Sequence, residues 1–159
     1  MNITFQEAVA LAKRSGACDA ALDVVSRMSG WDEFARHPQA PKWACWYAIS
    51  VAGARVPELE PIIARDPQEA YYYALDLAER FPEGEPVIAK NSNLAYFYAY
   101  LVIKDRWPEA EPVIAKSTTY AYVLIPSRSG LLSNSSPPQA PRIQPLATAV
   151  AKIQAHAPS

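Results

Sequence analysis

The amino-acid sequence predicts an all-α fold, a short α-solenoid of helix-pair repeats with a helical N-terminal cap and a flexible C-terminal tail. The first observation is a phrase of alanine and aromatic residues that recurs at nearly constant spacing, beginning at Ala44, Ala70, Ala95 and Ala121. The second is a Pro-Glu-x-Glu-Pro segment that follows three of these copies in step. A period of about 25 residues accommodates two short helices and two turns, as in α-solenoids.

The repeats divide the 159 residues into three parts. Residues 1–41 are a predicted helical N-terminal cap or degenerate repeat, and residues 42–125 hold three to four helical repeats. Residues 126–159 are a Pro/Ser-rich tail, with one weak helix expected at residues 146–155. Repeat arrays need an atypical end unit, because an ordinary unit would leave its apolar face uncovered.

Three short helices are predicted in the N-terminal part. Thr4 and Glu7 have the spacing of a capping box, so the first helix should begin there. Asp19 is placed to start the second helix, and Ser29-Gly30 should end it. The third should end before Pro38. The predicted spans are residues 5–14, 19–28 and 31–36.

The first helix of a repeat is defined best in the second unit. Asp66 can cap it, Pro67 suits the first helical position, and Glu69 completes a capping box. Asn91 and Ser117 occupy equivalent capping positions in later units. Each first helix should end near an arginine of its unit, namely Arg55, Arg80 or Arg106.

An alternative applies to residues 95–103, where Tyr96, Tyr98 and Tyr100 alternate and could lie in a buried strand. The second unit favours a helix, because its apolar residues follow helical spacing and its charged residues would interrupt a buried strand. The predicted core positions of that helix are Ala70, Tyr73, Ala74 and Leu77.

The Pro-Glu-x-Glu-Pro segment is predicted to form the second helix of each unit. Its glutamates lie at the start and a Lys or Arg at the end, which is favourable with the helix dipole by about 0.3–1 kcal/mol each. This explanation gives the paired glutamates no catalytic role. The second proline of the motif lies past the first helical position, so each helix should begin late or kink there. These prolines are Pro61, Pro86 and Pro112.

The charge distribution argues against a dedicated nucleic-acid binder, which normally has a dense basic face. The net charge is -1, with 12 basic and 16 acidic residues in 1–125, and with Arg128, Arg142, Lys152 and no acid in 126–159. A nucleic-acid-associated or DNA-mimic accessory protein is the alternative function. Its basic edge would consist of Arg55, Arg65, Arg80, Lys90, Arg106 and Lys116.

The sequence also predicts a cytoplasmic protein that does not bind a membrane. Residues 1–7 lack the features of a signal peptide, and the longest apolar run is ten residues, against about 20 for a membrane span. Cys18 and Cys45 are expected to be two buried thiols in a reducing compartment.

No catalytic motif is present: the sequence has no phosphate-binding glycine loop, zinc-binding His-Glu-x-x-His or nucleophile elbow. His37 and His156 are the two histidines, and a Cys45/His37 nucleophile pair has no more than chance spacing. We therefore expect no enzyme activity, catalytic residue, metal or cofactor.

The aromatic residues give the candidate binding site. A helix that buries Ala70 and Tyr73 points Tyr72 to the opposite side. The equivalent residues in the other units are Trp46, Phe97 and Val123, so the first three rings would form a ladder for a protein partner. The predicted binding site also includes Tyr71 and Tyr96, which adjoin Tyr72 and Phe97 in the sequence. Alternatively, the N-terminal helices, the tail or a second copy in a homodimer covers the ladder.

The repeat phrases, Ala-Tyr-x-Tyr-Ala and Arg-Trp-Pro-Glu-x-Glu-Pro-Val-Ile-Ala-Lys, resemble a family of short α-helical repeats in uncharacterised proteins of bacteria and their viruses. Gly16-Ala17-Cys18 with Ala21, Trp31 and Trp43 resembles an N-terminal segment of similar phage-associated proteins. The resemblance implies a helical repeat fold and a viral or prophage setting. The repeat array and the aromatic ladder favour a non-enzymatic protein-interaction module. In a phage setting it would be an inhibitor or modulator of a host protein, including a defence protein, in the host cytoplasm.

Overall fold

The computed structural model describes residues 3–117, which form helices joined by turns, without a strand. Residues 95–103 are helical, so the helix prediction is confirmed there and the strand alternative is wrong. The fourth repeat, the tail and His156 lie outside the described residues. The elements are α1 (Phe5–Arg14), α2 (Asp19–Val25), α3 (Trp31–Arg36), α4 (Ala40–Trp46), η1 (Tyr47–Ala52), α5 (Glu60–Ile63), α6 (Pro67–Leu77), α7 (Glu85–Ile88), α8 (Ser92–Tyr98), η2 (Ala99–Ile103) and α9 (Glu111–Ile114), where η denotes a π-helical segment.

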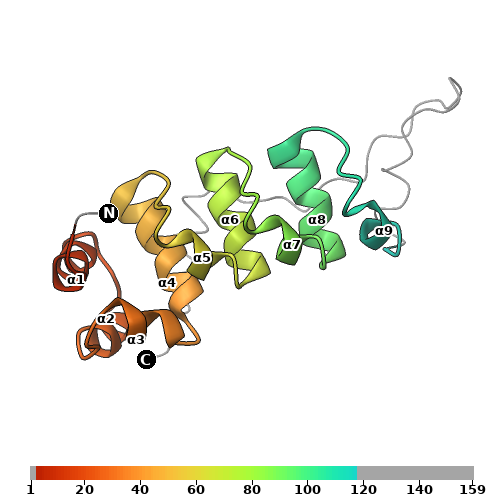
Figure 1. Cartoon of the computed structure of the whole chain (residues 1–159). Helices are drawn as coiled ribbons and strands as arrows, with labels where there is room; N and C mark the ends of the chain where they lie inside the picture. The colour runs from red at the N-terminus through yellow and green to blue at the C-terminus, as the bar shows by residue number, and fades with distance from the viewer. Residues whose placement is uncertain (1–2, 118–159) are drawn as a thin grey trace, which may run out of the picture.

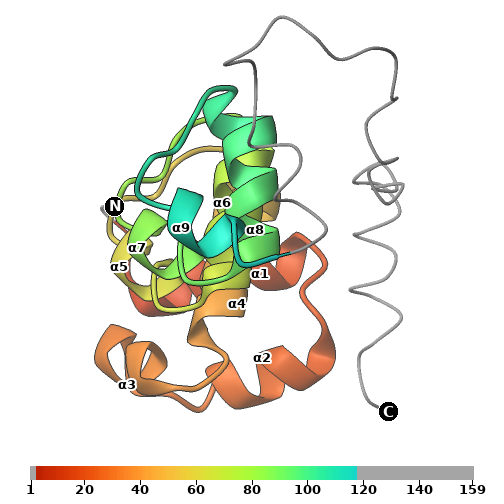
Figure 2. The same ribbon diagram turned by 90° about the vertical axis from the view of Figure 1, so that its right-hand side faces the viewer.

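The helices from α4 onward lie in two rows. Helices α4, α6 and α8 stand side by side in one row, and each packs against the short helix that follows it, α5, α7 or α9 (Figure 1). Figure 2 shows the three short helices on one side of the longer ones. At the N-terminal end, α1 contacts η1 and α3 contacts α4. One apolar core runs from these N-terminal helices through both rows.

The N-terminal helices follow the sequence prediction closely. The capping box at α1 is formed: the Glu7 carboxylate accepts from the Thr4 N–H at 2.7 Å, and Thr4 Oγ1 accepts from the Glu7 N–H at 3.3 Å. The bounds of α3 are also as predicted, whereas α2 ends at Val25, three residues earlier than predicted. Val24 within α2 is exposed. The prediction of two buried thiols is half wrong, because Cys18 is exposed and only Cys45 is buried.

The first helices of the repeats begin at the predicted caps. Asp66 Oδ1 accepts from two backbone N–H groups of the first turn of α6, at 2.8 and 3.0 Å. Asn91 Oδ1 does the same for α8, at 3.0 and 3.2 Å. Glu69 does not complete a capping box, because the Asp66 N–H donates instead to the Ile63 carbonyl at 3.2 Å.

The repeats that begin at Ala44 and Ala95 are each 26 residues long, and the repeat that begins at Ala70 is 25 residues long. This one-residue difference lies inside the first helix of the repeat. In the first and third units the helix ends in a π-helical segment, and nine residues separate the alanine of the phrase from the left-handed C-cap. In the second unit, α6 stays α-helical to its end and the separation is eight residues. The π turn therefore takes up the extra residue before the helix ends.

Each of these helices ends at a residue with positive φ. Gly53 has φ of 60°, Ala78 of 54° and Lys104 of 58°. The helices end near their arginines, as predicted, and each arginine lies two residues beyond this cap. The left-handed conformation stops the helix, although only the first unit has the glycine that usually marks it.

Ala78→Gly is expected to raise the free energy of unfolding by about 0.5–1 kcal/mol, because glycine adopts positive φ without a Cβ penalty. Lys104→Gly should do the same. The reverse substitution, Gly53→Ala, should cost about 1 kcal/mol of backbone strain alone, since nothing lies within 4 Å of an added Cβ. Urea denaturation followed by circular dichroism measures all three, and a destabilised Ala78→Gly variant would contradict the prediction.

The second helices begin late, as the position of their prolines predicts. Each starts at the second glutamate of the motif, which places the proline in the first turn. Each is only four residues long, and its last residue is fully buried between the rows. These buried residues are Ile63, Ile88 and Ile114.

The turn before each second helix fills the core with two residues of complementary size. The equivalent buried positions hold Val56 and Leu59, Phe81 and Gly84, or Trp107 and Ala110. At the second junction the ring leaves no room for a larger partner. A Cβ added at Gly84 would lie 2.5 Å from Phe81 Cδ1 and 2.8 Å from the Ala70 Cβ.

Candidate functional site

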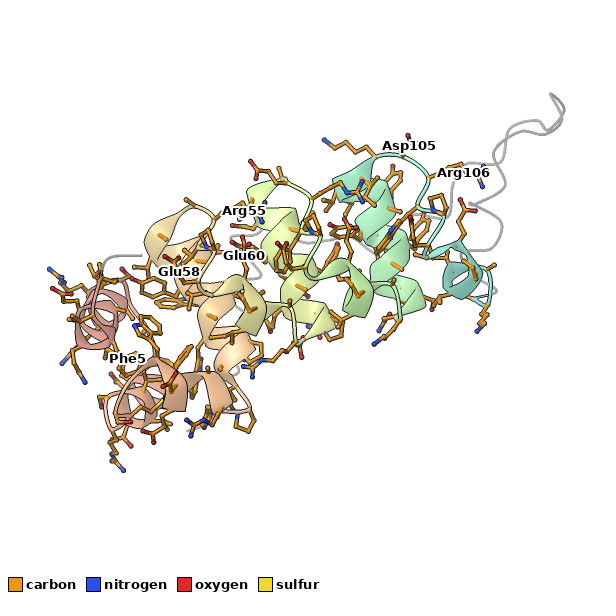
Figure 3. All side chains as sticks on the ribbon, in the orientation of Figure 1. Phe5, Arg55, Glu58, Glu60, Asp105 and Arg106 are labelled. Atoms are coloured by element: carbon orange, nitrogen blue, oxygen red, sulfur yellow. The ribbon has the colours of Figure 1, made fainter. Side chains whose placement is uncertain are left out.

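The most regular polar feature joins neighbouring repeats through a buried carboxylate. Glu60, only 5% exposed, receives two hydrogen bonds from the Arg55 guanidinium, at 2.7 and 3.0 Å. Tyr73 of the next unit donates its hydroxyl to Glu60 Oε1 at 2.9 Å and accepts from the Val56 N–H at 3.0 Å. Figure 3 shows Arg55 and Glu60 side by side at this turn.

The second junction repeats this arrangement. Arg80 holds Glu85 with two bonds of 2.9 Å, and Tyr98 donates to Glu85 at 2.9 Å while accepting from the Phe81 N–H at 2.8 Å. Arg106 and Glu111 form the third pair, with two bonds of 2.8 Å. The second glutamate of each motif is therefore a structural ion-pair partner, a role beyond the helix dipole that the sequence suggested.

The pKa values at the first junction follow from burial and hydrogen bonding. Burial alone would raise the pKa of Glu60, but the hydrogen bonds from Arg55 and Tyr73 outweigh it and hold the pKa below its ordinary value. Burial raises the pKa of Tyr73 to about 12. The ionised carboxylate and the neutral phenol are thus the stable forms near neutral pH.

Glu60→Gln is expected to flatten the acid side of the stability profile. Because the pKa of Glu60 is lower in the folded chain than its ordinary value of 4.5, this group stabilises the fold above about pH 4.5. That contribution is lost as the pH falls through the folded-state pKa. Urea midpoints measured from pH 7 to pH 3 should therefore fall less steeply in the variant. Glu109→Gln, at an exposed position, controls for the loss of one negative charge, and equal slopes for Glu60→Gln and wild type would contradict the expectation.

The structure separates the predicted aromatic site residues by exposure. Tyr72 is 43% exposed, whereas Trp46, Phe97 and Tyr96 are half-buried. Tyr71 is only 6% exposed, and burial raises its pKa to about 12. Tyr72 is thus the most exposed residue of the predicted set.

Sequence reasoning missed a second exposed ring, Tyr100, which is 60% exposed on η2. It stacks on Tyr96, with ring centroids 6.2 Å apart and the planes within 4° of parallel. The spacing of four residues between these tyrosines was the available signal. We call Tyr72 and Tyr100 the exposed tyrosine pair; α6, which carries the first, packs against η2, which carries the second.

Trp46 lies in the wall of an apolar cavity between the N-terminal helices and α4. The cavity has a volume of about 70 Å³, and it is lined by Phe5, Val9, Leu22, Trp46, Tyr47 and other residues. Phe5 reaches from α1 toward α3, where its ring lies 5.1 Å from that of Trp31 (Figure 3). The N-terminal helices therefore cover this end of the predicted ladder in part.

The structure does not join Cys45 and His37 into a nucleophile pair. The Cys45 thiol donates to the Glu69 carbonyl at 3.5 Å, and burial raises the pKa of the thiol. The His37 ring instead stacks on Trp43, with centroids 4.6 Å apart. Both side chains are accounted for by packing and local hydrogen bonds.

No helix in the described part of the chain is long and apolar enough to cross a membrane. Comparison with protein-family models, with curated proteins and with solved structures gave no match. The case for a function therefore rests on the exposed tyrosine pair and its surroundings.

Proposed function

We propose that the protein is a non-enzymatic protein-interaction module, a short α-solenoid capped by its N-terminal helices. The two rows of helices and the repeated Arg–Glu–Tyr junctions support the solenoid, because equivalent residues of successive units make equivalent contacts. The module would bind a protein through the face that carries the exposed tyrosine pair.

The exposure of these two rings carries the proposal. Within residues 3–117, the exposed large hydrophobic side chains are those of Val24, Tyr72 and Tyr100. The two tyrosines lie on neighbouring helical segments of one row. Tyrosine offers a large rigid contact area at low entropic cost, and it dominates binding energy at many interfaces. Leu75 on α6 and Phe97 on α8 are half-buried and pack against the apolar core.

The resemblance of the repeats suggests the kind of partner. A phage-encoded inhibitor or modulator of a bacterial defence protein, acting in the host cytoplasm, is the specific form of the proposal. A second copy of the chain could occupy the same face and give a homodimer.

Tyr72→Ala/Tyr100→Ala should abolish partner capture from a bacterial lysate while leaving the fold intact. Loss of two interface tyrosines should lower affinity by at least about tenfold. Val24→Ala removes another exposed apolar side chain, from α2, and is the control. Unchanged capture by the folded double variant, quantified by mass spectrometry, would refute the proposal.

The alternative, a nucleic-acid-associated or DNA-mimic accessory protein, has less support. Three of the six residues of the predicted basic edge, Arg55, Arg80 and Arg106, are each held by a carboxylate. Neutralised arginines contribute little to phosphate binding. A mobility shift with DNA or RNA at low salt would favour this alternative over the protein partner.

A further inference from the structure

The cavity between the N-terminal helices and α4 is lined entirely by apolar and aromatic residues. Three of them are the tryptophans Trp31, Trp43 and Trp46, and none carries a charge. The volume of the cavity is about 70 Å³. A dry apolar cavity of about 150 Å³ holds one benzene molecule, so about half that volume has room for roughly three to four non-hydrogen atoms.

Helix α2 closes one side of this cavity with Ala21, Leu22 and Val25. These three side chains are half-buried, and no residue of α2 is buried. The helix lies at the edge of the molecule and packs mainly on α1 (Figure 2). A small molecule can therefore enter the cavity by a displacement of α2 that uncovers no buried residue of this helix.

Tyr47 also lines the cavity, and it is the counterpart in the first unit of Tyr73 and Tyr98. The hydroxyl of each later tyrosine donates to a glutamate and accepts from a backbone N–H of the preceding unit. Before Tyr47 the N-terminal helices take the place of such a unit. Tyr47 is only 9% exposed, and its hydroxyl has no hydrogen-bond partner among residues 3–117.

A buried hydroxyl without a partner carries a desolvation cost, which a ligand that supplies the partner removes. Water alone is a poor occupant, because a buried water molecule makes about three hydrogen bonds. Among the side chains that line the cavity, Tyr47 has the only hydroxyl. A charged ligand is also unfavourable, because no charged residue lines the cavity to pair with it.

We propose that this cavity is a binding site for a small uncharged molecule with an apolar body and one oxygen atom, such as a short-chain alcohol. The apolar body would lie among the tryptophan rings, and the oxygen would bond to the Tyr47 hydroxyl. The ligand oxygen would thus act as the glutamate oxygen does for Tyr73 and Tyr98. The inference needs no protein partner, so it can stand or fail separately from the proposed function.

The test is a titration of the full chain with 1-propanol, followed by the indole N–H signals in nuclear magnetic resonance spectra. The signals of Trp31, Trp43 and Trp46 should shift along one saturable curve, with a dissociation constant on the order of millimolar for so small a ligand. The fourth tryptophan, Trp107, is buried at the third junction, and its signal should stay in place.

Tyr47→Phe should weaken the binding of 1-propanol about threefold to tenfold, because it removes one hydrogen bond. The binding of 1-chloropropane, which has a similar shape but no hydroxyl, should change by less than about twofold. Ala21→Leu should abolish the binding of both molecules, because the larger side chain fills the cavity. Ala20→Leu makes the same change at an exposed neighbour that does not line the cavity, and it should leave binding unchanged.

Circular dichroism verifies that each variant is folded. Absence of a saturable shift with 1-propanol would overturn the inference. Unchanged binding by a folded Ala21→Leu variant would do so as well, because the ligand would then bind elsewhere. Equal weakening of both molecules by Tyr47→Phe would refute the hydrogen bond to the hydroxyl. This last comparison decides the inference even if Ala21→Leu does not fold.

Discussion

Gly84→Leu is expected to lower the free energy of unfolding by about 3 kcal/mol, because the new side chain would overlap with atoms of the closely packed core. A new Cβ alone would lie 2.5 and 2.7 Å from two carbons of the Phe81 ring and 2.8 Å from the Ala70 Cβ. None of these atoms is the far end of a flexible side chain. The second junction must therefore open or shift to admit the leucine.

A compensating change should restore most of the loss. Phe81→Val/Gly84→Leu recreates the combination of Val56 and Leu59 at the first junction, and it should return the stability to within about 1 kcal/mol of wild type. Urea denaturation followed by circular dichroism compares the single and double variants. Gly30→Ala is the control, since nothing lies within 4 Å of a Cβ there. Failure of the double variant to recover would show that the two positions are not exchangeable in this way.

Tyr73→Phe is expected to cost about 2–3 kcal/mol, although it removes a single oxygen atom, because both hydrogen bonds of that oxygen are buried. The hydroxyl is the donor to the Glu60 carboxylate at 2.9 Å and the acceptor of the Val56 N–H at 3.0 Å. Its loss leaves a buried N–H without a partner and a buried carboxylate with one donor fewer, which carries a desolvation cost.

The neighbouring residue provides a matched control. Tyr72→Phe makes the same chemical change on the same helix, but at an exposed position, and it should change the stability by less than about 0.5 kcal/mol. Guanidinium denaturation of both variants gives the comparison. In a Glu60→Gln background the effect of Tyr73→Phe should shrink, because the two groups share one hydrogen-bond network. Equal effects of Tyr72→Phe and Tyr73→Phe would contradict the importance of this junction.

The fold could be predicted where its causes are local. The capping residues Thr4, Asp66 and Asn91 act within one helical turn, and the burial of Ala70 and Tyr73 follows from helical phase. The helix ends at Ala78 and Lys104 could not be predicted, because neither residue type favours positive φ. The sequence indicated only that the helices end near Arg80 and Arg106, which lie two residues beyond these caps.

The candidate site was predicted less completely because long-range packing decides exposure. Helical phase placed Tyr72 on the outer face, but it cannot show that the N-terminal helices cover Trp46 in part or that Tyr71 is buried. Tyr100 was missed because it lies in a π turn, where α-helical phase no longer applies. One sequence pattern that predicts the junction hydrogen bonds was not used. Tyr73 and Tyr98 each follow their glutamate at the same distance along the chain.

The π turns have a consequence for how such a chain can change in length over evolution. Insertions are usually accommodated in surface loops, because helices resist a change of register. In this chain, units that differ in length by a single residue keep the same arginine–glutamate pairing, since the additional residue widens the last helical turn. The turns that carry the arginine–glutamate pairs therefore stay the same from unit to unit. An inserted or deleted residue can be tolerated at the ends of the first helices.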